Sequence, residues 1–251
     1  MVTIVGSFLV GVLVFALIAV WFAPIAGILP ALFVSVTMFF VVTMRVGKRV
    51  QNALAGLQPL LEARRVDEAM VLLDEVRRKY GKFQVMLDSQ LQGQAGLIEY
   101  MQMRFDQALP LLEKGSFRNW TAHTAIGCVH YRRGRKEEAW KSFDKAASVG
   151  AKEVIVYAIW AKLLIKDGKH KDALAAVRKG QKAMPGNGLM KEIVHRVANK
   201  KGIDPKKLPE SYLQFWPEEY AKQMVMRGRR GGPMVKQPTM RIGAKQLRRR
   251  S

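Results

Sequence analysis

The first 44 residues of this 251-residue chain contain no Asp, Glu, Lys, Arg or His. Residues 3–23 and 25–44 form two apolar runs, and each run is long enough as a helix to cross a hydrocarbon core of roughly 30 Å. Pro24 lies between the runs and favours a turn there. The sequence therefore predicts a transmembrane helical hairpin over residues 1–44.

The charges that flank the apolar runs predict the orientation of this hairpin. Arg45, Lys48 and Arg49 directly follow the second run, whereas the turn between the runs carries no cation. Because basic flanking residues stay on the cytoplasmic side, we expect an integral membrane protein with both termini and the rest of the chain in the cytoplasm. A cleaved signal peptide is the alternative, but it requires a basic start and a short apolar core.

Charge also divides the remainder of the chain. Residues 45–219 contain 32 Lys and Arg against 20 Asp and Glu, whereas residues 220–251 contain 10 Lys and Arg and no acidic residue. This excess favours polyanionic partners such as anionic lipid, RNA or acidic protein surfaces. The single cysteine, Cys128, excludes an intramolecular disulfide and a cysteine-based zinc site.

A short pattern centred on alanine recurs four times after the apolar runs. Its copies are RRVDEAMVLL at 64–73, MRFDQALPLL at 103–112, GRKEEAWKSF at 134–143 and GKHKDALAAV at 168–177. The central alanines are Ala69, Ala108, Ala139 and Ala173, separated by 39, 31 and 34 residues. The apolar residues in each copy recur at three- and four-residue spacing, which indicates amphipathic helices. Such helices must stack on one another to bury their apolar faces.

The last interval equals the 34-residue period of tetratricopeptide repeats (TPRs), and the chain resembles this family. The resemblance is best over 154–187, where Ala161, Gly168 and Ala173 stand at the matching positions, and it extends to 120–153. Two upstream copies are weaker, and the copy around 89–119 has a second helix clipped by three residues. The resemblance implies an all-α, right-handed solenoid over residues 45–200, ending in a capping helix.

In TPR proteins the first helix of each repeat lines a concave groove, and the resemblance assigns this role to twelve positions here. They combine aromatic, sulfur and cationic side chains, which are typical of protein interfaces, and Arg132 with two lysines suits an acidic peptide. Thr124 and Cys128 replace residues of the Lys/Asn clamp found in chaperone-binding TPR domains, so a chaperone terminus is not expected. The predicted groove residues are Gln90, Leu97, Tyr100, Met101, Thr121, Thr124, Cys128, Tyr131, Arg132, Ile155, Lys162 and Lys166.

The sequence contains no pattern that indicates catalysis. The four histidines are scattered, and there is no H-E-x-x-H motif, phosphate-cradling loop or nucleophile elbow. His123 and His130 share a helix face but lack further metal ligands, and Cys128 is expected to behave as a small apolar residue. We therefore expect no enzymatic activity, no cofactor and no metal site.

Two different segments follow the repeats. Residues 201–225 combine prolines with aromatic residues such as Phe215 and Trp216, which either fold back over the last repeat or contact a partner. Residues 226–251 carry too little apolar surface to fold and are expected to be disordered. Because they contain no RNA-binding module and no regular base-stacking aromatics, their cations favour anionic lipid or acidic protein over nucleic acid or ribosomal phosphates. These cations are Arg227, Arg229, Arg230, Lys236, Arg241, Lys245, Arg248, Arg249 and Arg250.

These features together predict a membrane-anchored TPR scaffold or adaptor that binds a protein segment at the cytoplasmic face and serves the assembly of a membrane complex. Two alternatives stay open. The basic tail would instead tether nucleic acid or ribosomes to the membrane, or the chain would be a structural subunit of a membrane machine in which the hairpin makes the contacts.

Overall fold

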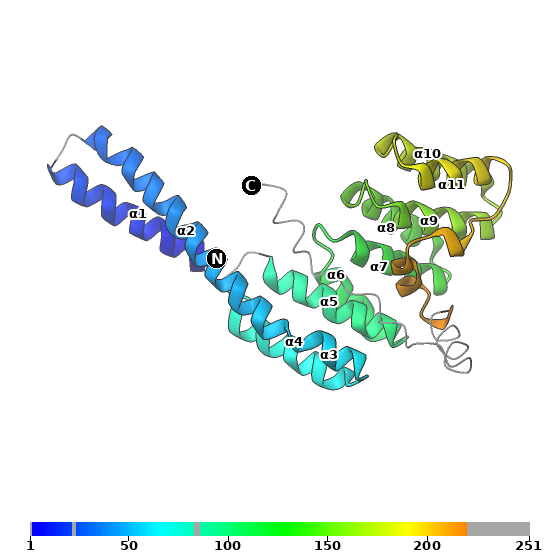
Figure 1. Cartoon of the computed structure of the whole chain (residues 1–251), viewed down its shortest axis with the longest axis horizontal. Helices are drawn as coiled ribbons and strands as arrows, with labels where there is room; N and C mark the ends of the chain where they lie inside the picture. The colour runs from blue at the N-terminus through cyan, green and yellow to red at the C-terminus, as the bar shows by residue number, and fades with distance from the viewer. Residues whose placement is uncertain (1, 22–23, 83–85, 220–251) are drawn as a thin grey trace. The chain divides into compact units, whose positions relative to one another are not determined.

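The computed structural model describes residues 2–21, 24–82 and 86–219, and every element assigned within them is helical (Figure 1). The prediction of an all-α fold is confirmed. The chain divides into two compact units, residues 1–91 and 92–251. The helices are α1 (Val2–Trp21), α2 (Pro24–Leu54), α3 (Leu57–Glu62), α4 (Val66–Tyr80), α5 (Leu87–Met101), α6 (Phe105–Lys114), α7 (Trp120–Arg132), α8 (Lys136–Val149), α9 (Val154–Lys166), α10 (His170–Ala183) and α11 (Gly188–Ala198), followed by the 3-10 helices η1 (Pro205–Lys207) and η2 (Glu210–Phe215).

In the first unit α1 and α2 pack side by side (Figure 1). Ser7 and Gly11, one helical turn apart on α1, are both buried. Small residues at this spacing let two helices approach closely. The opposite faces are apolar and open, because the side chains of Phe8 and Phe33 are 69% and 70% exposed.

The helix α2 does not end where its apolar run ends. It continues through Arg45, Lys48 and Arg49 to Leu54, so the cations that were expected to flank a membrane lie inside the helix. Across the described helices, none is both long and apolar enough to cross a membrane. The predictions of a two-span transmembrane hairpin and of an integral membrane protein are therefore wrong, and the orientation and lipid contacts inferred from them lose their basis.

Four helix pairs are joined by the same kind of turn. The residue two positions before α4, α6, α8 and α10 has a positive φ in every case, at Arg64 (58°), Met103 (61°), Gly134 (75°) and Gly168 (74°). The next backbone N–H then donates to a carbonyl five residues earlier, as from Arg65 to Leu60 (2.8 Å) and from Lys169 to Leu164 (2.9 Å). This is the hydrogen bond of a Schellman helix ending. The four pairs therefore share one local geometry, although only two of them have glycine at the turn.

The recurring alanines lie at the centre of these pairs. Ala69, Ala108, Ala139 and Ala173 are all fully buried. The two in-phase copies coincide with the pairs α7–α8 and α9–α10, since the first helices start 34 residues apart at Trp120 and Val154. The stacked pairs share one apolar core in the second unit, which makes this unit an α-solenoid.

Close crossings of the paired helices depend on glycine. In the pair α7–α8, a Cβ added at Gly127 would lie 2.8 Å from the ring of Phe143. In the pair α5–α6, a Cβ at Gly96 would lie 2.8 Å from Leu112. The helix α6 is only 10 residues long, whereas α8 and α10 have 14 residues each, which accounts for the short 31-residue interval between the alanines.

The helix α11 begins like a first helix but has no second helix after it. It ends in the same turn, because Lys200 has a φ of 54° and the N–H of Lys201 donates to the carbonyl of Arg196 at 2.8 Å. The chain then continues through the two 3-10 helices. We refer to residues 203–219 as the C-terminal extension; it is drawn in orange in Figure 1, and its helix η2 contacts α7.

A groove that holds the C-terminal extension

Side chains from three successive first helices meet on the C-terminal extension. They are Tyr100 at the end of α5, Arg132 at the end of α7 and Lys162 near the end of α9. All three belong to the predicted groove set, and all three contact residues between Tyr212 and Glu219. The groove residues are therefore brought together around a segment of the same chain.

Phe215 anchors the extension in the apolar part of the groove. Its side chain is fully buried, and its ring centroid lies 6.3 Å from that of Trp120 on α7. The hydroxyl of Tyr100, also fully buried, donates a hydrogen bond of 2.8 Å to the carbonyl oxygen of Phe215. This bond satisfies two polar groups that burial would otherwise leave unpaired at a cost of about 1–3 kcal/mol each.

Arg132 binds the acidic end of the extension. Its two terminal nitrogens pair with the carboxylate of Glu218, with Nη2 at 3.1 Å from Oε2, and Nη2 also lies 3.4 Å from the carbonyl oxygen of Phe215. The guanidinium carbon lies 4.8 Å from the ring centroid of Phe105. Burial lowers the pKa of Arg132, but the hydrogen bond to Glu218 and the nearby Tyr100 raise it, and the net shift is upward. The guanidinium therefore stays charged in a partly dry site.

Lys162 makes the second cationic contact. Its ammonium donates to the hydroxyl of Tyr212 at 2.7 Å and lies 3.4 Å from Oε1 of Glu219. It also lies 4.3 Å from the ring centroid of Trp216, and the guanidinium carbon of Arg132 lies 5.7 Å from the same centroid. Both distances are within the range of cation–π attraction. Burial, and then the charge of Glu219, raise the pKa of Tyr212, so its hydroxyl stays protonated.

A second polar cluster fixes the turn between α9 and α10. The hydroxyl of Tyr131 donates to Asp167 at 2.9 Å, and the ammonium of Lys136 lies 2.9 Å from the other carboxylate oxygen. The hydrogen bond from Lys136 is the main cause that lowers the pKa of Asp167, whereas burial and the contact with Asp167 raise the pKa of Tyr131 to about 12. Lys166 lies 6.0 Å from the ring centroid of Tyr131. This cluster links α7 and α8 to the turn after α9.

The other predicted groove residues have different surroundings. Thr124 is buried and its hydroxyl donates to the carbonyl of Trp120 at 2.8 Å on its own helix. Cys128 is buried, and burial raises its pKa to about 12, so the thiol stays protonated. Ile155 lies in the core, Gln90 is exposed on the first unit, and Leu97, Met101 and Thr121 are half-buried. The predicted tail residues Arg227, Arg229, Arg230, Lys236, Arg241, Lys245, Arg248, Arg249 and Arg250 lie outside the described residues.

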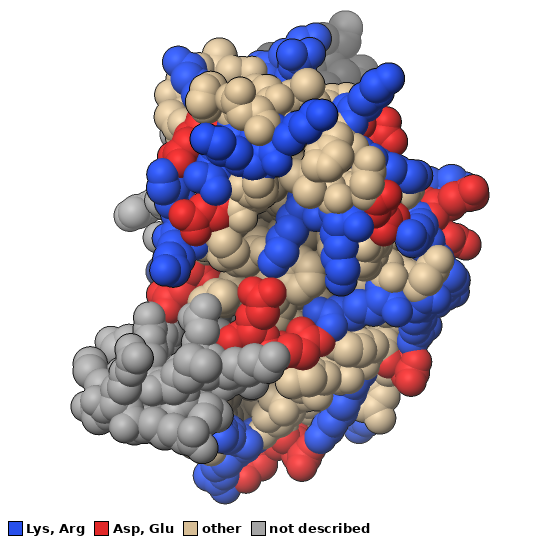
Figure 2. All heavy atoms as spheres, turned by 90° about the vertical axis from the view of Figure 1, so that its right-hand side faces the viewer, with Lys and Arg blue, Asp and Glu red and all other residues tan. Residues whose placement is uncertain are grey.

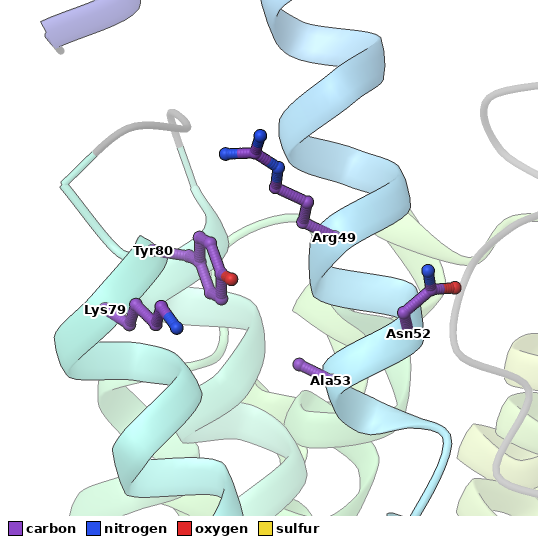
Figure 3. Close-up of a pocket in the computed structure, with 5 residues that line it drawn as sticks. All are labelled: Arg49, Asn52, Ala53, Lys79 and Tyr80. Carbon is purple, nitrogen blue, oxygen red and sulfur yellow. The ribbon is translucent and has the colours of Figure 1, made fainter.

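Two features outside the groove bear on ligand binding. Within residues 2–21, 24–82 and 86–219, no group of three or more His, Cys, Asp or Glu side chains could hold a metal ion. A pocket in the first unit is lined by Arg49, Asn52 and Ala53 of α2 and by Lys79 and Tyr80 of α4. Figure 3 shows that Asn52 points away from α4, whereas Arg49, Lys79 and Tyr80 extend into the space between α2 and α4.

Sequence reasoning missed three partners of the groove cations, one on α6 and two in the extension. Phe105, Glu218 and Glu219 were not singled out, although all three contact the groove cations. One signal was present in the sequence. Glu218 and Glu219 are the last acidic residues, and all charged residues in the segment after them are cations. An adjacent acidic pair beside two large aromatics resembles the acidic peptide for which the groove is suited.

The described helices thus define an all-α solenoid whose groove is filled by a peptide segment of its own chain. No family model matches the sequence, and no curated protein is detectably similar to it. Among solved structures, the chain is similar to the crystal structure of MamA protein, with 13% sequence identity, a TM-score of 0.45, and coverage of 75% of this chain and 99% of that chain. At this distance the likeness carries no argument about function, which must come from the groove.

Proposed function

We propose that this protein is a non-enzymatic scaffold that binds a segment of another protein in the groove lined by α5, α7 and α9. One observation carries the proposal: the groove already holds a short segment of the chain through side chains from three successive helix pairs. The groove combines an aromatic pocket with two cations, which is chemistry that protein interfaces favour.

The proposal is tested by capture of partners on the tagged, full-length protein. Arg132→Glu reverses the charge that meets the acidic end of a bound peptide, so it is expected to abolish the captured set. Arg178→Glu is the matched control, because Arg178 is exposed on α10 and makes none of the groove contacts described above. Capture that is the same for the wild type and both variants would rule out the groove as the binding site.

A second candidate function is tethering of nucleic acid or ribosomes through the basic tail. The observation that favours it is charge: residues 220–251 carry ten cations and no acid, and Lys and Arg outnumber Asp and Glu on the face of the molecule shown in Figure 2. Binding to phosphates weakens steeply with salt. If nuclease treatment or deletion of 226–251 removes all captured material while Arg132→Glu does not, tethering replaces the scaffold proposal.

A further inference from the structure

The C-terminal extension is buried at Leu208, Tyr212 and Phe215, whereas its acidic end is held at the groove rim by side-chain ion pairs. Two of its carboxylates pair with Arg132 and Lys162, and the carboxylates of Glu218 and Glu219 are 40% and 45% exposed. Ion pairs at such a rim are worth about 0.2–1 kcal/mol each and give specificity more than affinity. The part of the extension that carries the charge is therefore positioned to dissociate first.

In the sequence, the extension follows α11 at the point where a second helix would complete the pair. The helix α11 ends in the same turn as the first helices of the four pairs, but no second helix follows. Instead the chain passes back to α5, α7 and α9, none of which is adjacent to it in sequence. The extension is not part of the helix repeat, and it occupies the groove as a covalently attached ligand would.

We propose that residues 208–219 are an internal competitor, and that the groove recognises a partner segment with the same chemistry, namely large aromatic residues followed by adjacent carboxylates. This inference rests on the proposed scaffold function and names its partner class. The first ring fills the site of Phe215 beside Trp120, the second ring lies between the two cations as Trp216 does, and the carboxylates take the places of Glu218 and Glu219.

A different protein is favoured over a second copy of this chain as the occupant. A short tether gives the attached extension an effective concentration on the order of millimolar. The extension of a second copy has the same intrinsic affinity but is present at a much lower concentration, so it cannot compete. Only a segment that binds more tightly displaces the extension, and its apparent affinity is reduced by the fraction of grooves that are closed.

The test measures binding of a dye-labelled peptide of residues 208–219 (LPESYLQFWPEE) to the full-length chain. In Glu218→Gln the attached extension loses its ion pair with Arg132 while its buried rings remain, so more grooves are open. We expect the peptide to bind this variant about 1.4 to 5 times more tightly than the wild type. Glu210→Gln is the matched control, because Glu210 is exposed in the same extension and its replacement is expected to leave binding unchanged.

A second change confirms where the peptide binds. Adding Arg132→Glu to Glu218→Gln reverses the charge that the peptide carboxylates need, and binding is expected to be lost while the helical circular dichroism is retained. Glu218 and Glu210 are exposed or half-exposed, and Arg132 is partly buried at the end of α7, so the circular dichroism checks the fold of each variant.

Two results would overturn the inference. If the peptide binds none of these proteins, the extension is a permanent part of the fold and not a competitor, and the effect of Arg132→Glu on partner capture still decides the proposed function separately. If Glu218→Gln instead forms dimers in light scattering at concentrations where the wild type is monomeric, the occupant is a second copy. Indifference of partner capture to Arg132→Glu would defeat the scaffold proposal whatever the peptide does.

Discussion

Replacing Phe215 by alanine is expected to release the C-terminal extension while the helix pairs stay folded. The Phe215 side chain is fully buried against Trp120, between the buried Tyr212 and an acidic end of the extension that is held at the groove rim. Truncation of a buried Phe costs about 3–5 kcal/mol. At 1.4 kcal/mol per factor of ten, the equilibrium constant for opening of the extension is expected to rise about 100- to 3,000-fold.

Hydrogen exchange on the full-length chain measures this opening directly. Backbone amides within the extension, such as that of Tyr212, which donates to the carbonyl of Pro209 at 2.8 Å, are expected to exchange faster by the same factor. Amides in α8 and α10 are expected to keep their protection, because local opening does not require global unfolding.

A buried Phe inside a helix pair provides the control for this experiment. Phe143 is also fully buried, but it packs against Gly127 where α7 crosses α8. Phe143→Ala removes the same side chain and is expected to increase exchange throughout the second unit. If Phe215→Ala also increases exchange in α7 to α10 as strongly as in the extension, the extension does not open separately and the reasoning above is refuted.

Three further predictions concern the helix pairs, and each is measured by urea unfolding. Met103→Gly is expected to stabilise the protein by about 1 kcal/mol, because Met103 holds a φ of 61° that glycine adopts freely; a decrease in stability would contradict this. Gly127→Ala is expected to cost about 1–3 kcal/mol through its contact with Phe143, whereas Gly186→Ala, with nothing within 4 Å of the added Cβ, should not. The pKa of Asp167 is lowered from 3.8, so its stabilisation is present above that pH and lost as the pH falls through the lowered folded value; Asp167→Asn should remove this acid-side loss, and equal pH profiles would contradict it.

The helix pairs of the second half could be predicted because their local signals agree. Both have a glycine at the turn, at Gly134 and Gly168, and both repeat at 34 residues. The first two pairs have the same turn geometry but place Arg64 and Met103 at the position that favours glycine. Their sequence signal is therefore weak, because tertiary packing holds two non-glycine residues in a backbone conformation that their local preference opposes.

The membrane prediction is wrong, because no described helix is both long and apolar enough to cross a membrane. The apolar run ends at Met44, but arginine and lysine are good helix formers, and α2 continues through them to Leu54. The sequence showed where charge begins. It did not show that the same helix carries both the apolar run and the cations.

The groove could be predicted in part, whereas its occupant could not. Tyr100, Arg132 and Lys162 follow from the positions of the first helices in the repeat. Their contacts with the extension join residues 115, 86 and 50 positions apart in the chain. No local pattern encodes such distances, so the sequence left open whether Phe215 and Trp216 cover the protein itself or bind a partner.

The path of the extension changes how the stack of helix pairs can come apart. In a simple array each pair contacts only its neighbours, so pairs can fray one after another from an end. Here the C-terminal extension returns to α5, α7 and α9 and links three helix pairs. The contacts of the extension must break before α10 and α11 can unfold from the stack. A partner that displaces the extension would therefore destabilise the last helix pairs when it binds.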